Sequence, residues 1–142
     1  MKIPAKVNYA CKAALELAIR YNGETPVQLA IVSEAQKIPK NFLTQLFIRL
    51  RTAGIIKSAR GVDGGYFLAK RPSQISIADI FRAIDDSIIE IPKTLASGKI
   101  DSNKLITGVW DEISNDVVKR LEGISLESLV IKLKNEQPVY FI

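Results

Sequence analysis

The chain has 142 residues, of which 47% are hydrophobic and 25% charged, a composition typical of a globular protein rather than a disordered or fibrous one. A single cysteine and the absence of histidine exclude an internal disulfide and remove the commonest acid–base and metal-binding side chain. No apolar run approaches the length that crosses a bilayer, and residues 1–6 lack a signal-peptide core, so we expect a cytoplasmic protein without a membrane partner.

The net charge of +5 is unevenly distributed along the chain. Residues 1–71 carry 12 Lys and Arg against 4 Asp and Glu, whereas residues 72–142 carry 8 against 11. A basic first half indicates an anionic partner, although basic residues also simply solubilise a surface. The elements predicted within that half favour nucleic acid.

Apolar spacing predicts three helices in the first half of the chain. The first spans residues 5–22, a shorter one spans 28–36, and Pro39 opens a third. In the third helix the apolar residues fall at 42, 43, 46, 47 and 50, the stripe of an amphipathic helix. The opposite face near the helix start is polar and consists of Lys40, Asn41, Thr44 and Gln45.

Two short strands are predicted next, at residues 55–59 and 66–69, joined by a glycine-rich turn that indicates a β-hairpin. Arg60 begins the turn, and the glycines that follow allow the backbone to approach another surface closely. A polar helix face followed by an arginine-tipped hairpin is the arrangement of a winged helix-turn-helix. The first half of the chain is therefore predicted to bind DNA.

The second half is predicted to hold three more helices. Ser76 caps one that ends near residue 86, residues 87–105 are irregular, and a longer helix runs from about 105 to 122. A last helix reaches about residue 134, with a short terminal strand at 139–142. The longer helix carries an apolar stripe that packs either on the chain's own core or on a second copy, and we favour the dimer. The stripe consists of Ile106, Val109, Trp110, Ile113, Val117 and Leu121.

These elements define a mainly α fold with a small β-hairpin. We expect a winged helix-turn-helix DNA-binding domain at residues 1–72. A linking helix and an irregular segment at 73–104 follow, where a small-molecule or protein effector would bind. Residues 105–142 are expected to form a dimerisation helix and a C-terminal helix.

Nearly the whole chain resembles the winged helix-turn-helix regulators typified by IscR, NsrR and CymR. The resemblance rests on the start of the third helix (38–43), the segments 49–51 and 53–56, the wing from Arg60 to Leu68, and the pattern Ile77-x-Asp79-Ile80. It implies a homodimer on double-stranded DNA, with the third helix in the major groove and the wing in the adjacent minor groove.

By position, the resemblance places the start of the third helix and the wing arginine at the DNA. Asn41 and Gln45 carry the donor and acceptor that read an adenine edge, whereas the basic residues suit phosphates. Phe42 also begins the core stripe, and Arg49 and Arg51 are equally well explained as solvated charges. The candidate DNA-binding residues are Lys40, Asn41, Phe42, Thr44, Gln45, Arg49, Arg51, Arg60, Gly61, Gly64, Gly65 and Tyr66.

The chain departs from the family's pattern at its sensor. Cluster-binding members have three cysteines in the region that corresponds to residues 87–108, where this chain has none. Because thiolates hold most iron–sulfur clusters, we expect neither a cluster nor another metal cofactor. Cys11, on the apolar face of the first helix, is interpreted as a small buried hydrophobe. Thr44 replaces a glutamate of several relatives, which should shift base preference, and Lys37 stands where relatives often have glycine.

The leading hypothesis is a sequence-specific DNA-binding transcriptional regulator, expected to be a repressor, that binds an operator as a homodimer. The alternative is a winged-helix module that binds protein instead of DNA, which would more often expose apolar residues. We expect no enzyme. The glycine turn at 61–65 precedes a strand instead of a helix, so it is not a phosphate-binding loop, and a nucleophile–base pair has few candidate residues.

Overall fold

The computed structural model describes residues 2–85 and 100–136, and these form helices and one antiparallel hairpin. The predicted mainly α fold with a small β-hairpin is confirmed. The predicted strand at 139–142 and most of the segment at 87–105 lie outside the described residues. The elements are α1 Ala5–Ile19, α2 Leu29–Gln36, α3 Lys40–Thr52, β1 Ile56–Ala59, β2 Gly65–Leu68, the 3-10 helix η1 Pro72–Gln74, α4 Ile77–Ile84, α5 Ser102–Glu122 and α6 Leu126–Glu136.

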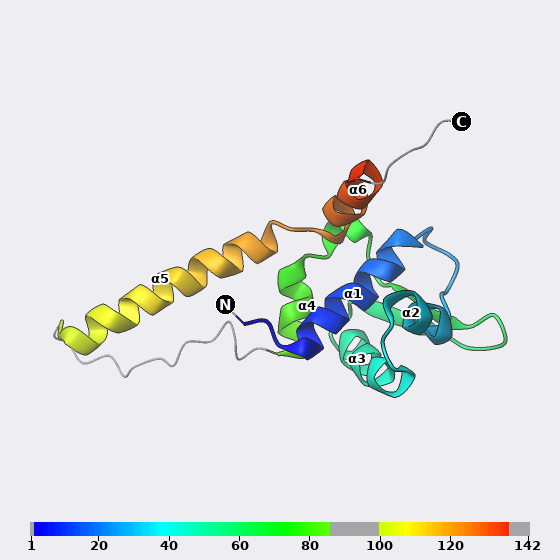
Figure 1. Cartoon of the computed structure of the whole chain (residues 1–142), viewed down its shortest axis with the longest axis horizontal. Helices are drawn as coiled ribbons and strands as arrows, with labels where there is room; N and C mark the ends of the chain where they lie inside the picture. Colours follow the sequence, from blue (N-terminus) through cyan, green and yellow to red (C-terminus); the bar gives the residue numbers. More distant parts are fainter. Residues whose placement is uncertain (1, 86–99, 137–142) are drawn as a thin grey trace.

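Helix α1 is the centre of the fold and contacts α2, α3, α4, α6 and β2. Its buried face includes the small residues Ala10, Ala13 and Ala14, which allow neighbouring helices to approach closely. It ends at Ile19, three residues before the predicted end at position 22. Figure 1 shows α3 and α6 on opposite sides of α1. Helix α3 packs on α1, α2, α4 and β1 through one side, and its other side remains exposed.

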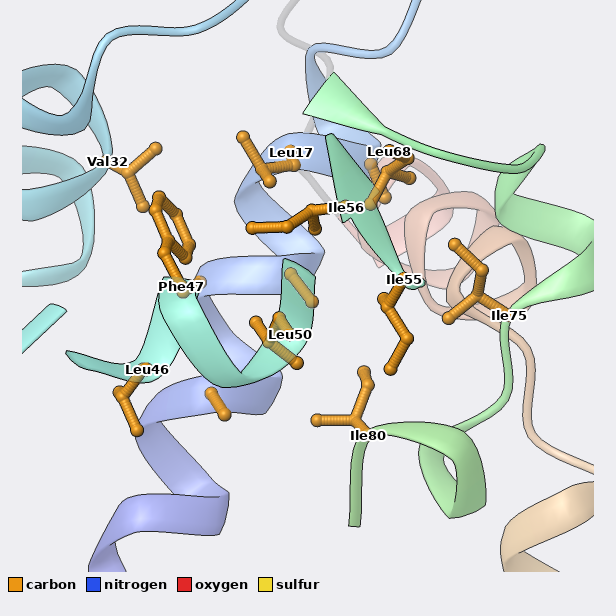
Figure 2. Packing of buried hydrophobic residues seen from close by; sticks show 14 of the residues in the cluster. Leu17, Val32, Leu46, Phe47, Leu50, Ile55, Ile56, Leu68, Ile75 and Ile80 are labelled. Atoms are coloured by element: carbon orange, nitrogen blue, oxygen red, sulfur yellow. The ribbon is translucent and has the colours of Figure 1, made fainter. Parts of the chain in front are cut away.

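One hydrophobic core joins both halves of the chain. Phe47, Leu50 and Ile56 of the winged helix-turn-helix pack in the same cluster as Ile75 and Ile80 from beyond it (Figure 2). These five side chains are each no more than 1% exposed. The core therefore continues past residue 72, where the sequence predicted the end of the DNA-binding domain.

The turn between α2 and α3 sets the orientation of α3. Lys37 adopts a left-handed conformation with φ of 55°, which glycine adopts at lower energetic cost. Ser33 holds the turn: its hydroxyl donates to the carbonyl of Ile38 at 2.5 Å, and its carbonyl accepts from the Ile38 N–H at 3.0 Å. Ile38 is buried, so the residue preceding α3 is anchored in the core.

The wing consists of β1 and β2, with Ser58 opposite Tyr66, and each strand lies within one residue of its predicted range. Tyr66 also pairs with Val27, in the connector between α1 and α2. Each backbone N–H donates to the other residue's carbonyl at 2.8 Å. The base of the wing is therefore attached to the helix-turn-helix by backbone hydrogen bonds as well as by packing.

This attachment predicts that Gly65→Ala destabilises the protein. A Cβ at Gly65 would lie 2.4 Å from the carbonyl oxygen of Val27, and relieving that overlap means breaking the backbone pair. We expect a loss of about 2 kcal/mol in the free energy of unfolding, measured by urea denaturation. Gly108→Ala is the control, because nothing lies within 4 Å of a Cβ there and alanine favours helix. An unchanged unfolding midpoint for Gly65→Ala would contradict the prediction.

The second half is joined to the body at the start of α4. Ser76 caps α4 as predicted: its hydroxyl accepts from the Asp79 N–H at 3.1 Å, and the Asp79 carboxylate accepts from the Ser76 N–H at 2.9 Å. The Ile77 N–H donates to the Ile124 carbonyl and the Leu126 N–H to the Ile75 carbonyl, both at 2.9 Å. These bonds fix the turn between α5 and α6 against α4.

Helix α5 begins at Ser102, earlier than the predicted position 105, because the Asp101 carboxylate caps it by accepting from the Lys104 N–H at 2.8 Å. No residue of α5 is buried, and the helix extends away from the body (Figure 1). None of the described helices is both long and apolar enough to cross a membrane.

Candidate nucleic-acid interface

The start of α3 presents an exposed polar face to the outside of the molecule. Lys40, Asn41 and Gln45 are exposed, and within the described residues none of the three side chains has a hydrogen-bond or ion-pair partner. Thr44 is half-buried, and its hydroxyl donates to the Lys40 carbonyl at 2.9 Å. The amides of Asn41 and Gln45 are therefore available for a ligand, whereas the Thr44 hydroxyl has already used its hydrogen.

Phe42 anchors the start of α3 to α1. Its ring packs edge-on against Tyr9, with the centroids 5.5 Å apart and the planes at 83°. The Nζ atom of Lys12 lies 5.8 Å from the centroid of the Tyr9 ring. Of the two interpretations of Phe42, this packing supports a core role, because the ring fixes the start of α3 against α1.

Two basic residues of α3 bind neighbouring elements of the chain. The guanidinium of Arg49 donates through Nη1 to the carbonyl of Ile84 at 2.9 Å, at the end of α4, where a cation is favourable. The guanidinium of Arg51 donates through Nη1 to the hydroxyl of Ser58 on β1 at 3.3 Å. The sequence predicted phosphate contacts or solvated charges, but both arginines connect α3 to its neighbours.

Arg49→Ala should therefore act on stability. Losing the bond to Ile84 should lower the free energy of unfolding by about 1 kcal/mol, measured by urea denaturation. The slope of log affinity for DNA against log salt concentration should stay unchanged. Lys40→Ala is the comparison, because each phosphate contact of Lys40 that is lost would lower that slope by about 1. An Arg49→Ala variant with normal stability and a lower slope would show that Arg49 contacts phosphate.

The wing turn is shaped by its glycines. Gly61 has a φ of 106°, and its carbonyl accepts from the Gly64 N–H at 3.0 Å, which closes the turn. A Cβ at Gly64 would lie 2.4 Å from the carbonyl oxygen of Ala59. Arg60 is exposed at the end of β1, and no interaction within the described chain engages its guanidinium. The turn thus carries a guanidinium that is available for a ligand.

Tyr66, predicted as a DNA-binding residue, supports the wing from its inner side. Its ring packs against Phe47 of α3, with centroids 4.6 Å apart, and its backbone pairs with Val27. The sequence placed Tyr66 next to the wing glycines but contained no signal for these long-range contacts. The side chain of Tyr66 therefore belongs to the packing that holds wing and helix together.

One exposed side chain of α3 was not singled out by the sequence pattern. Ile48 lies on the same side of the helix as Asn41 and Gln45, and it is 43% exposed. Helical spacing alone places it there, three residues after Gln45 and seven after Asn41. The exposed face of α3 thus contains an apolar residue among polar ones.

Comparison with known proteins identifies the family. The model of the Rrf2 family, described as iron-dependent transcriptional regulator, matches residues 3–132. The chain belongs to the Rrf2 family. IscR of Photorhabdus laumondii, an HTH-type transcriptional regulator, is 37% identical over 131 residues, which cover 92% of this chain and 79% of that protein.

Two solved structures share the fold of this Rrf2 chain along nearly its whole length. IscR of T. potens superposes with a TM-score of 0.80 at 30% identity, covering 99% of this chain and 94% of the other. CymR, the global cysteine regulator of B. subtilis, superposes with a TM-score of 0.76 at 30% identity, covering 93% and 98%. The Rrf2 chain is a winged helix-turn-helix, DNA-binding transcriptional regulator.

The apolar stripe of α5 in this Rrf2 protein is largely uncovered. Ile106, Val109, Trp110 and Ile113 are each about half exposed, with Trp110 at 52%. Towards the other end of the helix, Val117 is half-buried and Leu121 packs against the core. The chain's own core therefore covers only one end of the stripe.

The Rrf2 family is described as iron-dependent, but the side chains of this chain that could bind iron do not fit an iron–sulfur cluster. Cys11 is its single cysteine, and it packs half-buried against the core from α1. Burial raises the pKa of the Cys11 thiol from 9.0 to about 11, so the thiol stays protonated at neutral pH. The described residues contain no group of three or more His, Cys, Asp or Glu placed to hold a metal ion. One protonated thiol cannot replace the thiolates that hold an iron–sulfur cluster.

Proposed function

We propose that this Rrf2 protein binds a specific operator as a homodimer and represses transcription. The exposed face of α3 beside the wing supports this proposal most directly. Asn41 and Gln45 would read adenine edges in the major groove, and Lys40 would contact a phosphate. The wing would extend into the adjacent minor groove, with Arg60 at its tip. A regulator of this kind works in the cytoplasm and performs no catalysis.

The apolar stripe of α5 supports the homodimer. Four neighbouring apolar side chains that are half exposed form the kind of patch that marks a protein interface. A second copy would cover the patch with the same residues, as a twofold axis requires. Two α3 helices would then bind half-sites about 34–36 Å apart, so the operator should be an inverted repeat.

We further infer that this regulator responds to its signal without an iron–sulfur cluster. The metal-binding side chains support this inference, since the full sequence supplies one thiol and no imidazole. The effector would instead be a small molecule or a partner protein, bound in or beside the segment at 73–104.

The state of Cys11 tests this inference. Iodoacetamide reacts only with the thiolate, and burial raises the pKa of the Cys11 thiol from 9.0 to about 11. At pH 8, alkylation of the folded chain should therefore be about 100-fold slower than alkylation of the urea-unfolded chain. Between pH 9 and about 11 only the unfolded chain releases the thiol proton, so stability should fall as the pH rises. Cys11→Ala should remove that fall and keep DNA binding unchanged. Equal alkylation rates, or DNA binding that depends on Cys11, would contradict the inference.

The proposed function is tested by selecting bound fragments from the source genome at about 150 mM salt. We expect a common inverted repeat, bound with an affinity that falls steeply as salt is raised. Asn41→Ala combined with Gln45→Ala should lose most of the sequence preference and keep the salt-dependent, non-specific binding. Absence of salt-sensitive binding at micromolar protein would instead support the protein-interaction module.

A further inference from the structure

We propose that Ile48 determines part of the operator sequence by contacting the C5 methyl group of a thymine in the major groove. The proposal rests on the proposed function, since it requires α3 to lie in that groove. It adds an apolar specificity contact to the polar contacts of Asn41 and Gln45.

The position of Ile48 on α3 supports this role. The side of α3 that packs on the body consists of Leu43, Leu46, Phe47 and Leu50, each no more than 2% exposed. Ile48 is 43% exposed, and helical spacing places it away from that side, where it lines an open hollow with Arg82 and Ala83 of α4. It lies about two turns, or about 10 Å, along the helix from Asn41. A groove that receives Asn41 and Gln45 therefore also receives Ile48.

The neighbours of Ile48 make this part of the face apolar. The hydroxyl of Thr44 donates to the Lys40 carbonyl, and the hydroxyl of Thr52 donates to the Ile48 carbonyl, both at 2.9 Å. Thr44 and Thr52 stand one turn before and one turn after Ile48, with their donors engaged by their own helix. Arg49 and Arg82 line the same hollow as Ile48, but their guanidiniums donate to the Ile84 carbonyl and to the Glu122 carboxylate. Several donors around Ile48 are thus engaged within the fold, although the amide of Gln45 lies beside it.

The major groove presents one apolar group that matches such a surface, and that is the thymine methyl. The other base edges present hydrogen-bond donors or acceptors, which Ile48 would leave unpaired at a cost in affinity. The residue should therefore favour thymine over cytosine, which occupies the same position without a methyl.

The test uses the operator selected above. Each thymine of a half-site is replaced in turn by deoxyuridine, which removes only the methyl and keeps every hydrogen-bonding edge. For the wild-type protein, we expect one thymine whose replacement weakens binding about fourfold, the effect of one buried methyl. For Ile48→Ser, the same replacement should have no effect. Ile48→Val, which keeps an apolar contact, should retain most of the wild-type response.

Ile131→Ser is the matched control, because Ile131 is an exposed isoleucine on α6, on the other side of α1 from α3 (Figure 1). It should show the wild-type response to every deoxyuridine. The role of Ile48 would be overturned if no deoxyuridine replacement weakened binding of the wild-type protein, or if Ile48→Ser kept the wild-type response. Neither result would contradict the proposed function. Failure of the wild-type protein to bind DNA at all would overturn both.

Discussion

Trp110→Asp should dissociate the homodimer and abolish operator binding while the winged fold remains intact. Trp110 lies within the uncovered stripe of α5, where it is 52% exposed in the single chain. In a twofold dimer the aspartate would occur twice, and each carboxylate would lose its water without gaining a partner charge. A monomer reads one half-site only and loses the gain in avidity, about 10²- to 10⁴-fold, that a linked second site provides.

Sedimentation velocity measures the dissociation, and titration of the selected operator measures the loss of binding. The control is Asn115→Asp, which adds the same charge to the opposite, exposed face of α5 and should stay dimeric and bind DNA normally. Circular dichroism should show unchanged helix content for both variants. A Trp110→Asp protein that sediments as a dimer would place Trp110 outside the interface.

Features that depend on local spacing were predicted well from the sequence. The buried face of α3 consists of Leu43, Leu46, Phe47 and Leu50, all part of the predicted stripe, because a helix repeats about every 3.6 residues whatever surrounds it. The Ser76 cap and the glycine turn of the wing are equally local, since they depend on one or two neighbouring residues.

Contacts between distant segments could not be predicted in the same way. Arg49 and Ile84 are 35 positions apart, and nothing in the spacing of either helix indicates that a guanidinium of one meets the last carbonyl of the other. The contact between Phe47 and Tyr66 likewise depends on how the wing folds back onto α3. Candidate site residues chosen by charge or by position therefore included side chains whose partners lie within the fold.

Two residues show that a position can set a requirement which the chemical type of its residue does not reveal. Lys37 adopts a left-handed conformation although it is not glycine, so the position requires a backbone angle and lysine meets it. Ile48 is apolar, yet helical spacing places it opposite the core. For Ile48, its place in the helical repeat is therefore a better guide to its exposure than its chemical type.

Arg60→Ala should weaken operator binding at least tenfold, the cost of about 0.7 kcal/mol or more at each of two wings. Arg60 follows β1 at the start of a turn whose shape depends on Gly61 and Gly64, and no residue of the described chain engages its guanidinium. Because a narrow minor groove concentrates negative potential, the loss should be largest for operators with an A·T tract under the wing. Titrating the wild-type protein and Arg60→Ala with operators that have or lack that tract measures the loss of affinity.

Lys132→Ala is the charge-matched control, since it removes one positive charge from an exposed position of α6 and should change affinity little. Arg60→Lys separates two causes. A lysine restores the charge but lacks the planar, weakly hydrated guanidinium, so it should recover phosphate attraction without recovering the preference for a narrow groove. Full recovery of both by lysine would show that Arg60 contributes only charge. Unchanged affinity and footprint for Arg60→Ala would place the wing tip away from DNA and leave recognition to α3 alone.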